Sequence, residues 1–397
     1  RAAHGISRGL NALRATEASF ENASSNKALG AAFVEGTILS SYQFLKYKTK
    51  EIKANTLAKL IINENSVTKA ELIELEATSQ GTLIARELVN EPLSFLTAEQ
   101  LSKEIVKIGK DAGFKVEVLN KKKIEALKMG GLLAVNRGSQ RPPTFNILEY
   151  KPAKAKNKKP LILVGKGVVY DTGGLSLKPT PNGMDMMKCD MGGAATVIGT
   201  LYAIAKLKLP IHVVGLIPAT DNRPGEDAYV PGDVVAMMNG MNVEVLNTDA
   251  EGRMILADAL TYAGKYKPEL VFDFATLTGA AKAALSGIAS AYMGTADADT
   301  KKKIEASSQN VHEHIWELPM WEEYGNLIKS EVADIKNLGG PDAGAITAGK
   351  FLEHFATFPW LHFDIAGSAY LMAEDSYRGK YGTGVGVRMM VDFIKNY

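Results

Sequence analysis

Short β-rich segments alternate with helical patterns along most of this chain, and this alternation limits the fold more than any other feature. Residues 144–150, 161–164 and 270–274 have the length and apolar content of buried strands. Helical patterns at residues 194–206 and 253–265 lie between such runs. We therefore expect an α/β fold with a largely parallel central sheet covered by helices on both faces. The other predicted strands are residues 114–119, 211–217 and 243–246.

The chain is long enough to form more than one structural unit, since it has 397 residues. Residues 1–78 show helices around a short apolar segment, and the regular alternation begins near Ser79. We expect a smaller N-terminal α/β region at 1–78 and a catalytic domain at 79–397. In open parallel sheets, ligands bind beyond the carboxyl ends of the strands. The loops after residues 164, 246 and 274 are therefore the expected positions of the functional site.

Composition argues against several classes of partner. Lys and Arg number 46 against 44 Asp and Glu, for a formal charge of +2, so nucleic acid is not an expected partner. No apolar run reaches the roughly 18 residues that a membrane span requires, so no membrane association is expected. With Cys189 as the only cysteine, no internal disulfide can form, which favours a reducing compartment such as the cytoplasm.

Four acidic residues occur in glycine-rich segments close to predicted strands or helices. A single aspartate there is usually a helix cap or a turn residue. Several carboxylates that converge repel one another unless cations neutralise them. Two divalent metals about 3.5–4 Å apart provide that charge and also activate water. The acids are Asp171, Asp190, Asp249 and Glu251, interleaved with Lys166, Lys178 and Arg253.

Other hydrolytic chemistries find little support. All six histidines fall outside these loops, and the chain has neither the His-Glu-x-x-His helix nor the Gly-x-Ser-x-Gly elbow. Residues 344–350 resemble a phosphate loop, but Phe351 stands where Ser or Thr should hold magnesium. We predict a turn there, followed by a helix at 351–358. Cys189 is interpreted as a small buried side chain.

Residues 247–253 read Asn-Thr-Asp-Ala-Glu-Gly-Arg, and this run resembles the signature of the leucyl aminopeptidase (cytosol aminopeptidase) family residue for residue. Further similar segments lie at 166–178, 184–195, 275–280, 316–319, 333–334, 362–367 and 382–388, so the resemblance covers most of 80–397. It implies a metal-dependent exopeptidase that releases N-terminal amino acids, preferably leucine-like and apolar, from peptides. A metal-bridging water would be the attacking group, and the assembly would be a homohexamer.

The resemblance also implies a role for each matched residue. One metal would be bound by Lys166, Asp171, Asp190 and Glu251, and the other by Asp171, Asp249 and Glu251. The metals would be zinc or manganese, with magnesium or cobalt as further options. Lys178 would polarise the scissile carbonyl, and Arg253 would hold a bicarbonate ion as general base. The pocket for the first side chain would be formed by Met187, Thr276, Gly279 and Ala366.

Two features depart from the family pattern. The N-terminal region is shortened, and Ala369 takes a pocket position where a larger residue such as Met is common. Because of the second departure, we do not expect a strict preference for leucine as the first residue of the substrate. Two other functions stay open at this point: a DNA-binding architectural or regulatory protein of the same family, and a two-metal phosphoesterase.

Overall fold

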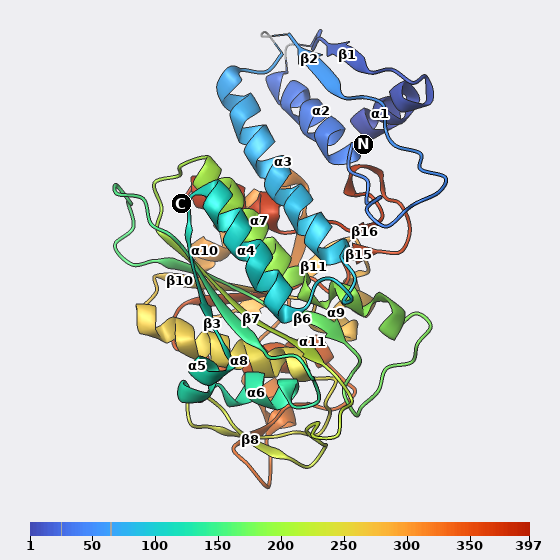
Figure 1. Cartoon of the computed structure of the whole chain (residues 1–397). Helices are drawn as coiled ribbons and strands as arrows, with labels where there is room; N and C mark the ends of the chain where they lie inside the picture. Colours follow the sequence, from blue (N-terminus) through green and yellow to red (C-terminus); the bar gives the residue numbers. More distant parts are fainter. Residues whose placement is uncertain (25, 64–65) are drawn as a thin grey trace.

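A mostly parallel sheet forms the centre of the molecule in the computed structural model, which describes residues 1–24, 26–63 and 66–397 (Figure 1). In spatial order its strands are β12, β11, β14, β10, β5, β7, β4 and β3, and β6 pairs with β7. The pairs from β14 through β10 and β5 to β7 are all parallel, whereas β3, β4 and β11 join through antiparallel pairs. The strands are β3 (Lys115–Leu119), β4 (Thr144–Tyr150), β5 (Leu161–Gly165), β6 (Gly167–Asp171), β7 (Val213–Asn222), β10 (Leu270–Ala275), β11 (Ala289–Gly294), β12 (His314–Glu317) and β14 (Trp360–Asp364).

Helices cover both faces of this sheet, as the sequence predicted (Figure 1). Successive side chains of a strand point to opposite faces, and β5 shows the result. Leu161 and Leu163 pack in one hydrophobic core, while Ile162 and Val164 pack in the other. The first core includes α3 (Lys69–Asn90), α4 (Ala98–Ala112), α7 (Gly192–Lys206), α10 (Ala298–Val311) and α12 (Val387–Lys395). The second includes α5 (Lys121–Ala126), α6 (Gly130–Asn136), α8 (Glu251–Ala263) and α11 (Gly344–Glu353).

The N-terminal residues form a small α/β unit of α1 (Ala2–Ala12), β1 (Glu17–Phe20), α2 (Lys27–Ser40) and β2 (Lys59–Ile62). Strands β1 and β2 pair in parallel. A capping box of Thr68 and Glu71 starts the long helix α3, which leads from this unit into the main sheet layer (Figure 1). The boundary predicted between the N-terminal region and the catalytic domain, after residue 78, lies inside α3. The division at this residue stays a prediction. No helix in the described part of the chain is long and apolar enough to span a bilayer.

Three local expectations were wrong. The strand expected at 243–246 is β9 (Asn242–Glu244), which belongs to a separate sheet with β8 (Val234–Ala236) and β13 (Ile335–Lys336) rather than to the central one. The loop expected after residue 164 contains strand β6. Residues 344–350 are not a turn, because α11 begins at Gly344. In each case the local pattern gave too little information about length or pairing partner.

Candidate active site

The residues singled out from the sequence converge at one edge of the central sheet. Lys166 follows β5 directly, Asp171 ends β6, and Thr276 follows β10. Asp190 lies in the 3₁₀ helix η1 (Met184–Met191), and Glu251 begins α8. Together they border a cavity of about 300 Å³, which is also lined by Lys178, Met187, Asp249, Arg253, Gly279 and Ala366. This is the position at which parallel sheets usually bind ligands.

Close backbone approach brings these loops together. Gly173 and Gly174 have φ of 86° and 62°, values that favour glycine, and they turn the chain after β6. The turn allows the Gly173 amide to donate to Asp171 Oδ1 at 2.8 Å. Gly252 matters for a different reason, because a Cβ there would lie 2.6 Å from both Cε and Nζ of Lys166. The signature run therefore needs glycine at 252 so that Lys166 fits against α8.

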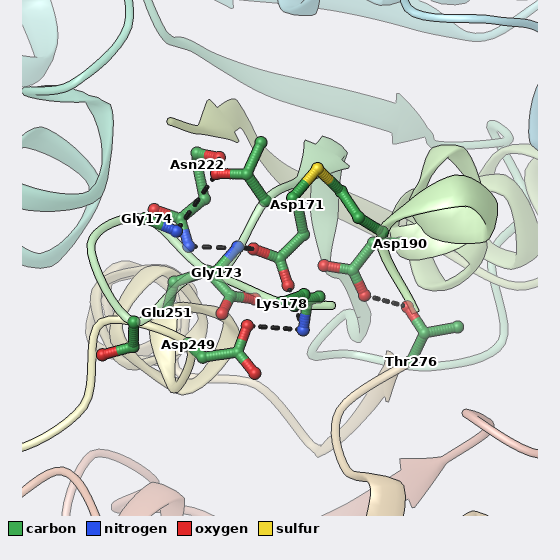
Figure 2. A network of polar contacts seen from close by, with 12 residues as sticks. Asp171, Gly173, Gly174, Lys178, Asp190, Asn222, Asp249, Glu251 and Thr276 are labelled. Atoms are coloured by element: carbon green, nitrogen blue, oxygen red, sulfur yellow. Dashed lines mark hydrogen bonds and ion pairs between the residues drawn. The ribbon is translucent and has the colours of Figure 1, made fainter. Parts of the chain in front are cut away.

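One group of contacts surrounds Lys166, which is only 2% exposed. Its Nζ lies 2.8 Å from Asp190 Oδ2 and 2.8 Å from Glu251 Oε1. It also donates to the carbonyl oxygen of Thr276 at 3.0 Å. The hydroxyl of Thr276 donates to Asp190 Oδ1 at 2.8 Å, as Figure 2 shows. Lys166 thus lies between two carboxylates that the family resemblance assigns to the same metal.

A second group of contacts surrounds Lys178. Its Nζ lies 2.9 Å from Asp171 Oδ2 and 2.5 Å from Asp249 Oδ1 (Figure 2). The other oxygen of Asp171 accepts from Asn222 Nδ2 at 2.8 Å, so this carboxylate is held on both sides. Asp249 is the more accessible acid, with a side chain 32% exposed. The four acids therefore form two pairs, Asp190 with Glu251 around Lys166 and Asp171 with Asp249 around Lys178.

The charge states show how strongly these groups interact. Burial raises the pKa of Asp190 well above its usual value, against the opposing charge of Lys166. Burial also raises the pKa of Asp249 to about 7, and Asp171 adds to this shift. Burial alone would lower the pKa of Lys166, but the neighbouring carboxylates outweigh it and raise that pKa. The cluster holds more negative charge than its buried surroundings stabilise.

The donor set fits divalent metal ions. Carboxylate oxygens of Asp171, Asp190 and Glu251 all lie within 4.8 Å of one another. Glu251 Oε2 is buried and accepts no hydrogen bond from any residue that the structure describes. Buried carboxylate oxygens normally have a partner, so an oxygen of this kind suits a cation. Carboxylates with one nitrogen donor are common ligands of zinc and manganese.

Arg253 lies beside the acid cluster and is 5% exposed. Its Nη1 donates to the carbonyl oxygen of Asn337 at 2.8 Å, which fixes one side of the guanidinium. Its Nε makes no hydrogen bond within the described residues. Burial lowers the pKa of Arg253 to about 10, and at neutral pH the group stays a cation.

Sequence reasoning missed the residues that support the site from other elements. Asn222 ends β7 and joins Asp171 to the backbone oxygen of Thr248 at 3.0 Å. Asp364, at the end of β14, accepts from the backbone amide and the hydroxyl of Thr278 and so shapes the loop before the cavity wall. Asn337 holds the start of the signature run, because its Nδ2 donates to the carbonyl oxygen of Asn247 at 2.8 Å. The available signal for Asn222 and Asp364 was a polar residue at the carboxyl end of a largely apolar segment.

A buried cluster of carboxylates and lysines at the carboxyl edge of a parallel sheet has the donor atoms and the position of a metal-dependent enzyme site. The family model described as cytosol aminopeptidase family, catalytic domain, matches residues 83–391. The chain therefore belongs to the cytosol aminopeptidase family, and it is a metal-dependent exopeptidase of the leucyl aminopeptidase type that acts at peptide N-termini.

Individual relatives agree with this assignment. A probable cytosol aminopeptidase of Chlorobaculum tepidum is 48% identical over 93% of this chain and 75% of the relative. One of Geobacter sulfurreducens is 44% identical over 92% of this chain and 74% of the relative. The bottromycin maturation enzyme BotP, in complex with Mn, matches with a TM-score of 0.92 and 33% identity, over all of this chain and 86% of that one. These matches lend no support to the phosphoesterase or DNA-binding alternatives.

Proposed function

We propose that the four acids, together with Lys166, form two overlapping ligand sets, and that each set holds one divalent ion. Lys166, Asp171, Asp190 and Glu251 hold the first, and Asp171, Asp249 and Glu251 hold the second. The observation that carries this proposal is the convergence of three buried carboxylates within 4.8 Å, one oxygen of which has no hydrogen-bond partner among the described residues. Zinc and manganese suit these donors, with magnesium and cobalt as alternatives. When bound, such a pair supplies a nucleophilic water near neutral pH and polarises the peptide carbonyl.

Lys178 donates to the carbonyl oxygen of the scissile peptide bond as negative charge develops there. In the structure its ammonium is paired with Asp171 and Asp249. When another cation neutralises those carboxylates, Lys178 can exchange them for the substrate oxygen. A compact point charge suits a developing oxyanion.

Arg253 holds a bicarbonate ion, which serves as the general base. Its planar fork matches a flat anion, and its Nε is free of partners in the described structure. The hydrogen bond to Asn337 holds the guanidinium in place at the cavity. Bicarbonate so held would accept the proton of the attacking water.

The free α-amine of a peptide is the group that selects N-terminal residues, because only an unprotonated amine can enter the metal site. The first side chain then contacts Met187, Thr276, Gly279 and Ala366, which all line the cavity. These residues are mainly apolar, which favours leucine and methionine.

The test compares a leucyl amide with its N-acetylated form, with and without added manganese or zinc. The free amine should be hydrolysed in a metal-stimulated reaction, and the blocked amine should be inert. Equal rates for the two substrates would contradict an exopeptidase site. A phosphate ester assayed beside them should not be turned over.

The assembly and the compartment are proposed on the family resemblance. A homohexamer is expected, which light scattering coupled to size-exclusion chromatography tests. The name of the relatives, cytosol aminopeptidase, supports a cytoplasmic location. The division into an N-terminal region at 1–78 and a catalytic domain at 79–397 is likewise proposed, and limited proteolysis tests it.

A further inference from the structure

We propose that Lys282 is a specificity-determining residue, which allows the cavity to accept an N-terminal glutamate through an ion pair with the glutamate carboxylate. This inference rests on the proposed binding of the first side chain against Gly279 and Ala366. It extends the expected substrates from leucine-like residues to an acidic residue of similar length.

The position of Lys282 follows from helix α9 (Gly279–Leu285), which begins at the cavity wall. A Cβ at Gly279 would meet no atom within 4 Å, so this face of the helix is open. Residues three apart share a helix face, with their Cβ atoms about 5–6 Å apart. Lys282 therefore lies one turn beyond Gly279 on the open face, and it lines the same cavity. Ala281, by contrast, points into the protein and is 2% exposed.

Lys282 also lies close to the segment that contains Ala366. A Cβ at Gly367 would be 3.4 Å from the Cα of Lys282, so α9 packs against this segment. Ala366 lines the cavity with only a methyl group, and this small side chain leaves space beside the lysine. A glutamate side chain in this space would pack its methylene groups against the apolar wall and extend its carboxylate toward α9.

The charge of Lys282 is available to a substrate. Within residues 1–24, 26–63 and 66–397, its ammonium makes no hydrogen bond or ion pair, whereas Lys166 and Lys178 each contact two carboxylates. Lys282 lines the cavity together with Thr276, Gly279 and Ala366, which the first side chain is proposed to contact. An unpaired cation beside an apolar wall is complementary to a side chain with an apolar stem and an acidic end.

The experiment compares kcat/KM for glutamyl and glutaminyl substrates that carry the same uncharged leaving group. These two substrates have nearly the same shape and differ in charge. In Lys282→Met the glutamyl-to-glutaminyl ratio should fall by up to about fivefold, the range expected for an ion pair that water reaches. The parent's ratio should also fall as salt is added, because salt screens such a pair. Lys282→Glu should lower the ratio further and raise the rate on a lysyl substrate relative to the glutaminyl one.

A control variant and a reference substrate separate the possible failures. Lys302→Met removes one positive charge from α10, on a residue that does not line the cavity, and should leave the ratio unchanged. A leucyl substrate is assayed with every protein. Absence of leucyl hydrolysis in the parent would refute the proposed function itself. Leucyl hydrolysis together with an unchanged ratio in Lys282→Met would overturn only the role of Lys282.

The position of the acidic residue in the peptide is tested separately. The dipeptides Leu-Glu and Leu-Gln carry the same pair of side chains at the second position. If Lys282→Met changed the ratio for these dipeptides and not for the glutamyl and glutaminyl substrates, Lys282 would contact the second residue. That result would overturn the inference as well.

Discussion

Gly252→Ala should disturb the site without disrupting the fold, because the added methyl group would contact Lys166 directly. Its carbon would lie 2.6 Å from both Cε and Nζ of that lysine, whereas carbon atoms pack best at about 3.5–4.0 Å. Lys166 would therefore have to move by about 1 Å. The lysine is 2% exposed and is held by two carboxylates at 2.8 Å, so it has little room to move.

The expected magnitude follows from this displacement. Disturbing the surroundings of a metal ligand typically costs about 10–100-fold in metal affinity or activity, and a 1 Å misplacement can cost about 10²-fold in rate. Helix propensity acts in the opposite direction, since Ala is favoured over Gly by up to about 1 kcal/mol within a helix. The variant should therefore melt within a few degrees of the parent, while its metal affinity and kcat/KM on a leucyl substrate fall by about 10–100-fold.

The assay measures bound metal after dialysis against defined free manganese, together with leucyl hydrolysis and a thermal melt. Gly9→Ala is the matched control, because a Cβ at this position in α1 would meet nothing within 4 Å. It should retain full metal content and rate. If Gly252→Ala also retained parental metal affinity and rate, the tight contact between Lys166 and α8 would be wrong.

Three further outcomes are expected. Lys166→Met keeps the apolar stem and removes the amine, so elemental analysis should find one tightly bound metal ion instead of two. Two tightly bound metal ions in this variant would show that Lys166 is not a ligand. Lys178→Ala should lower kcat by about 10²–10³-fold with metal content unchanged, and a parallel loss of metal would make Lys178 a ligand. Burial raises the pKa of Asp258 from 3.8 to about 7, so the folded protein favours the protonated carboxyl group. This contribution to the free energy of unfolding is fully present below about pH 4. It is lost as pH rises to about 7, at up to ~1.4 kcal/mol per pH unit. Urea unfolding should therefore show a weaker loss for Asp258→Asn over this range than for the parent, and parallel curves would contradict the buried protonated state.

Much of the site was predictable because its residues lie in short, glycine-rich runs next to apolar strands. Asp249 and Glu251 belong to one such run, and Lys166 follows the apolar strand β5 directly. Each run by itself indicates that charged side chains lie at the end of a buried strand or at the start of a buried helix. The functional roles of these residues came from family resemblance rather than from the pattern, and they stay predictions.

The sequence by itself determined the α/β class, the covered central sheet and the segments that carry the acids, because periodicity and glycine placement are local properties of the chain. The tertiary structure alone decided which groups meet. Lys166 contacts Thr276 across 110 residues of sequence, β9 leaves the central sheet, and Lys282 reaches the cavity through the packing of α9. No local pattern encodes these contacts, because they depend on strand order and on how closely helices approach the sheet.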